Sequence, residues 1–289
     1  MYNLTDISVI KDICSKYNFS FSKSLGQNFI INPSVCPKIA QMGGAEAQVG
    51  VIEIGTGFGV LTKELALRAK KVVAVEIDNN LLPVLEDTLS DFSNIKIINN
   101  DVLKVDLHKL IQDEFPDTDV VICANLPYYV TSPILMSLLE SRLPVKSITV
   151  MIQREAAVRI CSDMGKRECG AVTAAVRYYS EPEILFNVSR GSFFPAPNVD
   201  SCVVRLNIKE HTPENVVNEK FLFKVIRKAF EQRRKTLPNP LSALGIKKAD
   251  IIQCMEKINL KPTARAEELS LENFIELSNL LYKEVNQNE

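Results

Sequence analysis

The sequence predicts an α/β protein, in which a mostly parallel, doubly wound sheet is followed by a small all-helical C-terminal domain. Short apolar or β-branched runs alternate with segments of helical periodicity in the first half of the chain, a pattern typical of a parallel sheet. After a composition shift near residues 211–214, only helical periodicity remains. The chain has 289 residues and is 46% hydrophobic, which suffices for one large and one small domain.

The expected elements follow one another in a regular order. Five strands are expected at Val49–Ile54, Lys71–Glu76, Ile95–Asn99, Val120–Ala124 and Ser147–Ile152. The helices expected between them are Val60–Ala69, Asn79–Leu89, Leu107–Asp113 and Pro133–Ser141. Two further strands, Ile184–Val188 and Ser201–Ile208, flank a Gly/Pro-rich loop, and we expect them to form an antiparallel pair at one edge of the sheet. The N-terminal 20 residues predict a short amphipathic helix.

The C-terminal part contains three segments with helical periodicity and no strand signal, namely "EKFLFKVIRKAFEQRRKTL", "KKADIIQCMEKINL" and "SLENFIELSNLLYKEV". We therefore expect a first domain at 1–211, which includes the N-terminal helical extension, and a helical domain at 212–289.

Composition excludes several classes of protein. The net charge is -1 and the pI about 6.2, so the chain is not a wholly basic nucleic-acid binder, although a local basic patch is compatible with these values. No apolar run approaches the roughly 20 residues of a membrane span, and the polar N-terminus is no signal peptide. Seven scattered cysteines without a C-x-x-C pair indicate reduced thiols and a cytoplasmic location. His108 and His211 are the only histidines, so we expect no metal site and no Ser–His or Cys–His pair.

A glycine-rich loop follows the first expected strand of the sheet. In "VIEIGTGFGVLT", Gly55, Gly57 and Gly59 permit a tight turn and close approach of a ligand to the backbone. The G-x-G-x-G spacing differs from the G-x-G-x-x-G of dinucleotide folds, and no phosphate-binding lysine follows, so a P-loop is excluded. The alternative is a strand-to-helix turn that only favours glycine.

Polar residues also end the next expected strands. Glu76 ends "VVAVEID", where a carboxylate can accept hydrogen bonds from both ribose hydroxyls, and Asp101 ends "IINNDV". Asn125–Tyr129 reads N-L-P-Y-Y directly after the fourth strand. Taken alone, the acids are compatible with solvated strand ends, and N-L-P-Y-Y with a turn carrying two partly buried tyrosines. Because the carboxyl ends of parallel strands form the ligand-binding rim, together they predict one binding site.

The ordered set of motifs resembles class I S-adenosylmethionine-dependent methyltransferases. More narrowly, it resembles the ribosomal RNA adenine N6,N6-dimethyltransferases of the KsgA/RsmA type, which act on small-subunit (16S) rRNA. Besides the glycine loop and N-L-P-Y, the likeness rests on "SLGQNFIIN" at Ser24–Asn32, "FFPAPNVDS" at Phe193–Ser201 and "FEQRRKTL" at Phe230–Leu237. The resemblance spans roughly Phe21 to the C-terminus and implies a Rossmann-like, mostly parallel seven-stranded sheet.

The resemblance also implies S-adenosylmethionine as the cofactor. The cofactor-binding residues that it implies are Gln27, Asn28, Ile30, Gly55, Gly57, Glu76, Ile77, Asp101, Val102 and Asn125. Among them, the first three line the methionine end of the cofactor, Glu76 holds the ribose, and Asp101 with Val102 holds the adenine.

The residues that the resemblance implies for catalysis are Asn125, Leu126, Pro127, Tyr128 and Phe194. The Asn125 side-chain oxygen and the backbone carbonyl of Leu126 or Pro127 can accept the two N–H bonds of an adenine amine, which aims the nitrogen lone pair at the methyl group. Tyr128 would stack on the base, and Phe194 would form the opposite wall. Since the sulfonium is a good leaving group, positioning suffices without a metal. For Tyr129 we expect a packing role.

A run of basic residues in "FKVIRKAFEQRRKTL" is the candidate RNA contact. We expect Lys224, Arg227, Lys228, Arg234 and Lys235 to form one helical stripe, with Arg233 off it, and all six to bind RNA. The alternative for such a run is a solvated helix face.

The expected function is the transfer of methyl groups to N6 of two adjacent adenines near the 3′ end of small-subunit rRNA, linked to small-subunit biogenesis. The implied partner is small-subunit rRNA in the immature 30S subunit, bound by a monomer. The alternatives are a large-subunit (23S) adenine methyltransferase of the macrolide-resistance type and a non-catalytic rRNA-binding assembly factor. An NAD dehydrogenase is disfavoured by the glycine spacing.

Overall fold

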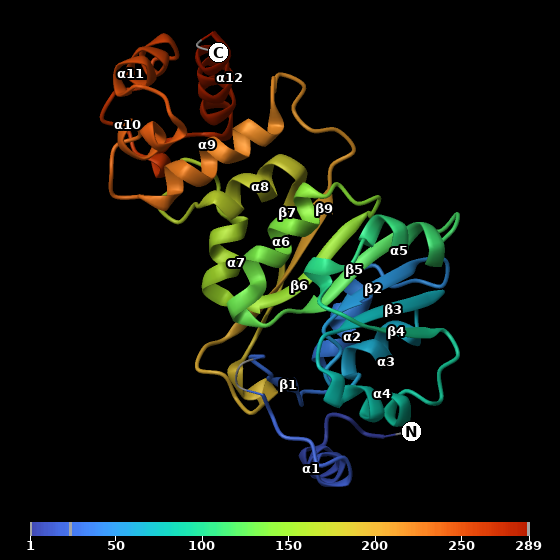
Figure 1. Ribbon diagram of the computed structural model, residues 1–289. Coiled ribbons are helices and arrows are strands. Elements are labelled where there is room, and N and C mark those ends of the chain that lie inside the picture. Colours follow the sequence, from blue (N-terminus) through green and yellow to red (C-terminus); the bar gives the residue numbers. More distant parts are fainter. Residues whose placement is uncertain (1, 23–24, 288–289) are drawn as a thin grey trace. The chain divides into compact units, whose positions relative to one another are not determined.

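The computed structural model describes residues 2–22 and 25–287 (Figure 1). Ser24, the first residue of the motif "SLGQNFIIN", lies outside the described residues. Contacts within the chain define two compact units, Met1–Ala157 with Pro182–Ile208, and Val158–Glu181 with Lys209–Glu289. The expected domain boundary at 211/212 stays a prediction. The contacts group Val158–Glu181 with the later helices, whereas we expected this segment in the first domain.

The first unit is built on a seven-stranded sheet, as predicted. Its strand order is β4 (Ile95–Asn99), β3 (Lys71–Glu76), β2 (Gly50–Ile54), β5 (Val120–Asn125), β6 (Ser147–Gln153), β9 (Ser201–Ile208) and β7 (Ser180–Val188). The first five of these run parallel, and β9 pairs antiparallel with β6. The two strands expected at one edge of the sheet are neighbours there, with β7 beginning at Ser180 rather than Ile184.

Helices cover both faces of this sheet. Every residue of β2 is buried, which requires a covering layer on each side. Right-handed crossovers place α3 (Val60–Ala66) and α4 (Leu82–Thr88) on one face, and α5 (Leu107–Glu114) and α6 (Thr131–Glu140) on the other (Figure 1). Helix α2 (Val35–Met42), which was not predicted, packs with α3 on the face that carries Val51 and Cys123.

The N-terminal extension packs on the α4 side of the sheet. Its helix α1 (Ile7–Lys16) begins after Asp6, whose carboxylate accepts a hydrogen bond from the Ser8 amide at 2.8 Å, and this N-cap fixes where the helix starts. Ile10 and Ile13 are buried in a cluster that also contains Phe58 and Leu85 of the α/β core. The predicted amphipathic helix is therefore confirmed, and its apolar face anchors the segment that leads to residues 25–30.

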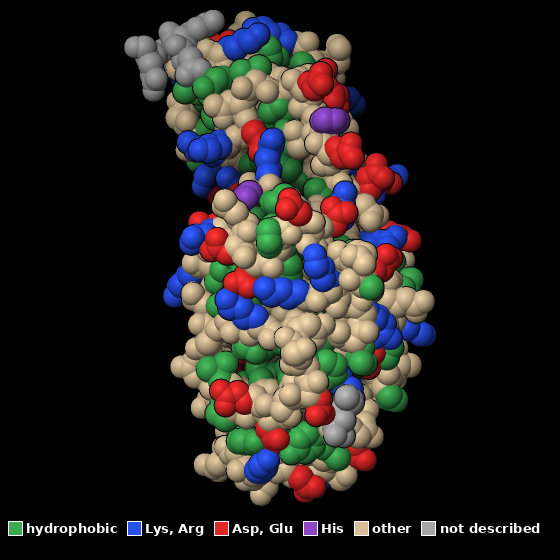
Figure 2. Space-filling view, turned by 90° about the vertical axis from the view of Figure 1, so that its right-hand side faces the viewer, with side chains coloured by type: hydrophobic (Ala, Val, Ile, Leu, Met, Phe, Trp, Pro, Cys, Tyr) green, Lys and Arg blue, Asp and Glu red, His purple; other side chains and the backbone are tan. Residues whose placement is uncertain are grey.

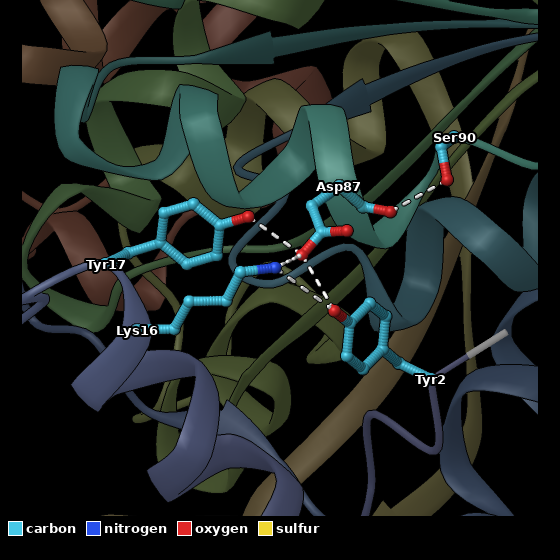
Figure 3. Close-up of polar contacts among 5 residues, drawn as sticks. All are labelled: Tyr2, Lys16, Tyr17, Asp87 and Ser90. Carbon is cyan, nitrogen blue, oxygen red and sulfur yellow. Dashed lines mark hydrogen bonds and ion pairs between the residues drawn. The ribbon is translucent and has the colours of Figure 1, made fainter.

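Polar contacts at the end of α1 reinforce this attachment (Figure 3). The Asp87 carboxylate of α4 accepts hydrogen bonds from Tyr2 and Tyr17 at 2.8 Å each and forms a 2.6 Å ion pair with Lys16. These three donors, Lys16 first, lower the pKa of Asp87 to about 2. We call Tyr2, Lys16, Tyr17 and Asp87 the N-terminal latch.

A two-stranded sheet joins two motifs that are far apart in the sequence. Strand β1 (Phe29–Ile30) pairs antiparallel with β8 (Phe193–Phe194), so that Phe29 lies opposite Phe194 and Ile30 opposite Phe193. This pairing brings "SLGQNFIIN" and "FFPAPNVDS" together, although neither was predicted to contain a strand.

The second unit is helical, as expected. Its helices include α8 (Ala171–Tyr179), α9 (Glu219–Glu231), α10 (Pro238–Leu241), α11 (Lys248–Lys257) and α12 (Leu271–Gln287), and α7 (Arg154–Cys161) crosses the boundary between the units. The aromatic rings of Tyr178 and Tyr179 lie 5.2 and 5.4 Å from that of Phe223 and join α8 to α9. No helix was predicted for residues 154–179, where α7 and α8 lie. Within residues 2–22 and 25–287, no helix combines the length and the hydropathy needed to cross a membrane.

Candidate active site

A pocket opens in the first unit where β2, β3 and β5 end. Its walls come from the glycine loop, the end of β3, the segment after β5 and the N-terminal loop that carries residues 25–30. The pocket lining includes most of the predicted site residues, namely Gln27, Asn28, Ile30, Gly55, Gly57, Glu76, Ile77, Asn125, Leu126, Pro127 and Tyr128. The lining does not include Asp101, Val102 or Phe194.

Gly55, Gly57 and Gly59 of the glycine loop all have positive φ, which disfavours any other residue at these positions. The first two differ in what lies next to them. A Cβ at Gly57 would lie 2.9 Å from the Phe29 ring, so this glycine is required by packing. A Cβ at Gly55 would find only the Asn125 carbonyl, at 3.9 Å, and would otherwise project into open space. Gly55 therefore leaves its backbone open to a ligand, whereas Gly57 serves the fold.

The Glu76 carboxylate connects β3 to the glycine loop. One oxygen accepts hydrogen bonds from the amide and the hydroxyl of Thr56, both at 2.8 Å, and the other accepts from the Asp78 amide at 2.9 Å. Glu76 is only 4% exposed. These three bonds leave part of the four-site acceptor capacity of a carboxylate available to a ligand.

The Gln27 side chain holds the N-terminal loop against the end of β3. Its amide nitrogen donates to Asp78 at 2.6 Å, and its carbonyl oxygen accepts from the Ser22 amide at 2.8 Å. The other Asp78 oxygen accepts from the Asn80 backbone amide and side chain. Gln27 therefore lines the pocket with both of its polar atoms already engaged, and its geometry is that of a positioning residue.

Asp101 lies just beyond the pocket wall, after β4. Its carboxylate accepts from the Leu103 amide at 3.0 Å and caps a short 3₁₀ turn at Val102–Lys104. The neighbouring Asn100 amide donates to the Glu76 carbonyl at 3.0 Å, which ties this turn to the end of β3. The two strand-end acids are therefore close along the rim, while only Glu76 reaches the pocket lining.

Polar groups without protein partners occur where β5 ends. Within the described part of the chain, no hydrogen bond engages the Asn125 side-chain amide or the Leu126 carbonyl. Leu126 as a whole residue is 1% exposed and anchors the segment. The Pro127 carbonyl accepts from the Val130 amide and the Thr131 hydroxyl, each at 3.2 Å. Of the two carbonyls considered in the sequence analysis, only that of Leu126 has no donor among the described residues.

The two tyrosines of N-L-P-Y-Y differ in their surroundings. The Tyr128 hydroxyl is 2.7 Å from the Ser201 hydroxyl, and burial raises its pKa. Ser201 belongs to the motif "FFPAPNVDS", but its role as an anchor for Tyr128 was not predicted. Tyr129 is 62% exposed and lines the pocket mouth, which contradicts the expected packing role.

Phe193 rather than Phe194 lines the pocket. Successive residues of a strand point to opposite sides, so only one of the pair can face the cavity. The Phe194 ring instead lies edge-on to Phe21, with their centroids 5.6 Å apart. The motif was correctly identified as part of the site, but the side-chain direction required the pairing of β8 with β1.

Glu53 is a buried acid beneath the glycine loop that received no role in the sequence analysis. It is fully buried on β2, and neither carboxylate oxygen has a hydrogen-bond partner among the described residues. Burial, with the Glu76 carboxylate adding to it, raises the pKa of Glu53 well above its usual range and favours the neutral acid.

The six predicted RNA-binding residues lie in the second unit but do not form one helical stripe. Helix α9 ends at Glu231, so Arg233, Arg234 and Lys235 lie on the following turn, and the expected helical geometry is wrong. Arg233 donates to Glu267 at 3.0 Å and to the Arg167 carbonyl at 2.6 Å. The exposed members of the set are Lys224, Arg227, Arg234 and Lys235, whereas Lys228 pairs with Glu231 at 2.9 Å.

Charge on the face of the molecule in Figure 2 is mixed, with basic and acidic side chains interspersed. This agrees with the net charge of -1 and limits any RNA-binding surface to local groups of basic residues. Among the residues that the structure describes, no group of three or more His, Cys, Asp or Glu side chains could hold a metal ion.

Comparison with known proteins identifies the family. Residues 18–283 match the family model described as ribosomal RNA adenine dimethylase. The Ribosomal RNA small subunit methyltransferase A of Geobacillus thermodenitrificans is 48% identical over 276 residues, which is 94% of this chain and 94% of the relative.

Two solved structures share the fold. A dimethyladenosine transferase from Plasmodium falciparum has a TM-score of 0.72 and 26% identity, over 89% of this chain and 98% of the other. The 23S rRNA methyltransferase ErmE has a TM-score of 0.63 and 24% identity, over 88% of this chain and 100% of the other, a likeness of fold alone. The predicted class I methyltransferase fold is confirmed, and the chain belongs to the ribosomal RNA adenine dimethylase family.

Proposed function

We propose that the protein methylates N6 of two adjacent adenines near the 3′ end of small-subunit (16S) rRNA and converts each to N6,N6-dimethyladenosine. Membership of the rRNA adenine dimethylase family makes it an rRNA adenine dimethyltransferase, with S-adenosylmethionine as methyl donor. The observation that carries the mechanism is the pair of acceptors at the end of β5, the Asn125 amide oxygen and the Leu126 carbonyl, which belong to two pocket-lining residues and have no donor among the residues that the structure describes.

The residues around Gly55 fit the cofactor. Open space beside Gly55 permits close approach to the backbone, and the amide groups at the start of α3 suit a carboxylate such as that of methionine. Glu76 would accept from the ribose through its remaining acceptor capacity, and Asp101 with Val102 would bind the adenine from the rim. When bound, the cofactor supplies a methyl group on a sulfonium, which is an electrophile that needs no metal.

Asn125 and Leu126 would orient the target amine. An adenine N6 has two N–H bonds, and the two free acceptors can each take one. Accepting both favours a pyramidal nitrogen and directs its lone pair towards the methyl group, so that positioning accounts for most of the catalysis. The nitrogen releases one proton to solvent with each transfer, and an acid–base residue is not required.

Tyr128 would stack on the adenine in the pocket. A base must leave its helical stack to reach such a site, and an aromatic face compensates for part of the stacking that is lost. The hydrogen bond to Ser201 fixes the ring at the pocket wall before the base arrives. Phe193, which lines the same pocket, is the better candidate than Phe194 for the opposite wall.

The helical region at 212–289 would bind rRNA through its exposed basic residues, chiefly Lys224, Arg227, Arg234 and Lys235. These contacts would supply affinity and salt dependence rather than choice of nucleotide. The substrate form would be the immature 30S subunit, bound in the cytoplasm by a monomer, without a metal ion.

Methylation of purified, unmethylated small and large ribosomal subunits in parallel tests the function. We expect methyl transfer to the small subunit alone, with two adjacent adenines detected by primer extension. Transfer to the large subunit would identify the macrolide-resistance type instead. An Asn125→Ala protein with full activity would contradict the mechanism, and a wild-type protein that binds subunits without methyl transfer would indicate an assembly factor.

A further inference from the structure

We propose that Tyr129 is a second stacking platform, which binds the nucleobase adjacent to the adenine held against Tyr128. The inference rests on the proposed function, since it concerns how two neighbouring bases of single-stranded RNA are held. It assigns a substrate-binding role to a side chain at the pocket mouth, where neither the family match nor the sequence motifs assign one.

The first observation is the position of the Tyr129 ring. It is 62% exposed, yet it belongs to the lining of the pocket that holds Asn125 and Tyr128. No hydrogen bond engages its hydroxyl among the residues that the structure describes. The ring therefore offers an aromatic surface at the entrance, and the protein itself does not use that surface for its core.

The second observation is that the backbone turn that carries the ring is closed. Tyr129 lies in the 3₁₀ turn Tyr128–Val130, which is closed by the bond from the Val130 amide to the Pro127 carbonyl. Its ring lies beside Gly26, where a Cβ would be 3.3 and 3.4 Å from two ring atoms. Gly26 has φ +60, so glycine is favoured there both by conformation and by the nearby ring. A ring on a closed turn requires no ordering of the backbone when a base stacks on it, which limits the entropy cost of binding.

The third observation is the contrast with Tyr128. Consecutive residues of a 3₁₀ turn point about 120° apart, since there are roughly three residues per turn. With Tyr128 fastened inward to Ser201, its neighbour is directed outward at the mouth. A nucleotide next to an extruded adenine lies at that mouth, because the two share one phosphodiester link. Stacking tolerates any base, so this platform would hold either neighbour of the target.

A fluorescence titration tests the placement directly. The chain contains no tryptophan, so Tyr129→Trp creates a single reporter at the pocket mouth. We expect an rRNA fragment with two adjacent adenines to quench the tryptophan emission. The fragment is added at concentrations that filter binding shows to be saturating. S-adenosylmethionine alone should leave the emission unchanged. The matched control is Leu67→Trp, at a residue 57% exposed on the same unit and outside the pocket, which should not respond.

Quenching of the Tyr129→Trp protein by the cofactor alone would show that the ring closes over the cofactor and would overturn the proposal. An unchanged emission with saturating RNA would overturn it equally.

Kinetics on unmethylated small subunits provide the second test. We expect Tyr129→Ala to raise KM about 5- to 100-fold, which corresponds to one lost stacking contact, and Tyr129→Phe to stay near the wild type. The affinity for S-adenosylmethionine should not change in either variant. A Tyr129→Ala protein with wild-type KM, or a Tyr129→Phe protein as impaired as Tyr129→Ala, would contradict the proposal. Absence of transfer by the wild type would reject the proposed function instead, and the fluorescence titration would still decide the role of Tyr129.

Discussion

The two sides of the pocket use their polar groups in opposite ways. On the side of β2 and β3, the Glu76 carboxylate accepts three hydrogen bonds from the protein, and Gln27 uses both polar atoms of its amide. On the side of β5, the Asn125 amide and the Leu126 carbonyl have no partner within the described residues. Both sides belong to the same unit and the same sheet rim.

The difference indicates two kinds of binding. On the side of β2 and β3, the protein already fixes the polar groups by hydrogen bonds, so this side is preorganised. A ligand there adds contacts without changing the positions of these groups. A side whose acceptors are unpaired is completed only by a donor from outside, and the adenine amine is the donor that the family membership provides. Substitutions on the two sides should therefore separate cofactor binding from methyl transfer.

The largest effect is expected for Asn125→Ala. Loss of one of the two acceptors leaves the amine free to rotate, and a misplacement of about 1 Å can reduce the rate about 100-fold. We expect single-turnover transfer to fall by about this factor or more, with an unchanged unfolding temperature because no protein partner is lost. A decrease of less than about 3-fold, far below that factor, would argue against a positioning role.

Glu76→Ala should have the next largest effect. It leaves the Thr56 and Asp78 amides without their acceptor, and one unsatisfied buried group costs about 1–3 kcal/mol. We expect the free energy of unfolding, measured with urea, to fall by about 2 kcal/mol or more. Glu76→Gln, which retains an acceptor oxygen, is the control and should lose less. A fully stable Glu76→Ala protein would show that the loop does not depend on this carboxylate.

Two neighbouring arginines in the second unit separate structure from RNA contact. Arg233 is paired with Glu267, whereas Arg234 is exposed and forms no ion pair with any residue that the structure describes. We expect Arg234→Glu to weaken RNA binding and reduce its salt dependence, with cofactor affinity unchanged. Arg233→Glu should also weaken RNA binding. In addition, it should lower the free energy of unfolding by at most about 1 kcal/mol, because the ion pair with Glu267 is lost. Equal loss of RNA and cofactor affinity in either variant would contradict an RNA contact.

The smallest effect is expected at the N-terminal latch, and it depends on pH. The folded-state pKa of Asp87 is about 2, below its ordinary value of 3.8. The lowered pKa of Asp87 contributes to the stability of the folded state. This contribution is fully present above pH 3.8 and is lost as the pH falls towards 2. Unfolding temperatures of the wild type and Asp87→Asn should therefore differ at pH 6 and converge near pH 2. A difference that persists undiminished near pH 2 would show that the Asp87 charge is not responsible.

Much of the fold follows from local patterns. The strands β3, β4 and β9 begin and end at the predicted residues, because apolar or β-branched runs between polar turns mark a strand on the sequence itself. The helices α2, α7 and α8 were not predicted, although each has an apolar stripe at helical spacing. The end of α9 was placed too late, because the basic run continues the helical pattern past Glu231.

The site could be predicted in part. Motifs placed Gly55, Glu76 and Asn125 at one rim, since strand ends and glycine spacing are local features. The choice between Phe193 and Phe194 depends on pairing between residues far apart, which no local pattern encodes. The same holds for the anchoring of Tyr128 by Ser201, which leaves Tyr129 exposed.

Calorimetric titration of S-adenosylmethionine into Asn125→Ala and Glu76→Ala is the most direct test of the division between the two sides. We predict that Asn125→Ala binds the cofactor within about 2-fold of the wild type, because we now assign its amide to the adenine, although the resemblance also placed Asn125 among the cofactor-binding residues. Glu76→Ala should lose at least about 10-fold, the equivalent of roughly 1.4 kcal/mol. Equal losses of affinity in both variants would contradict this division, because the two sides would then bind one ligand together.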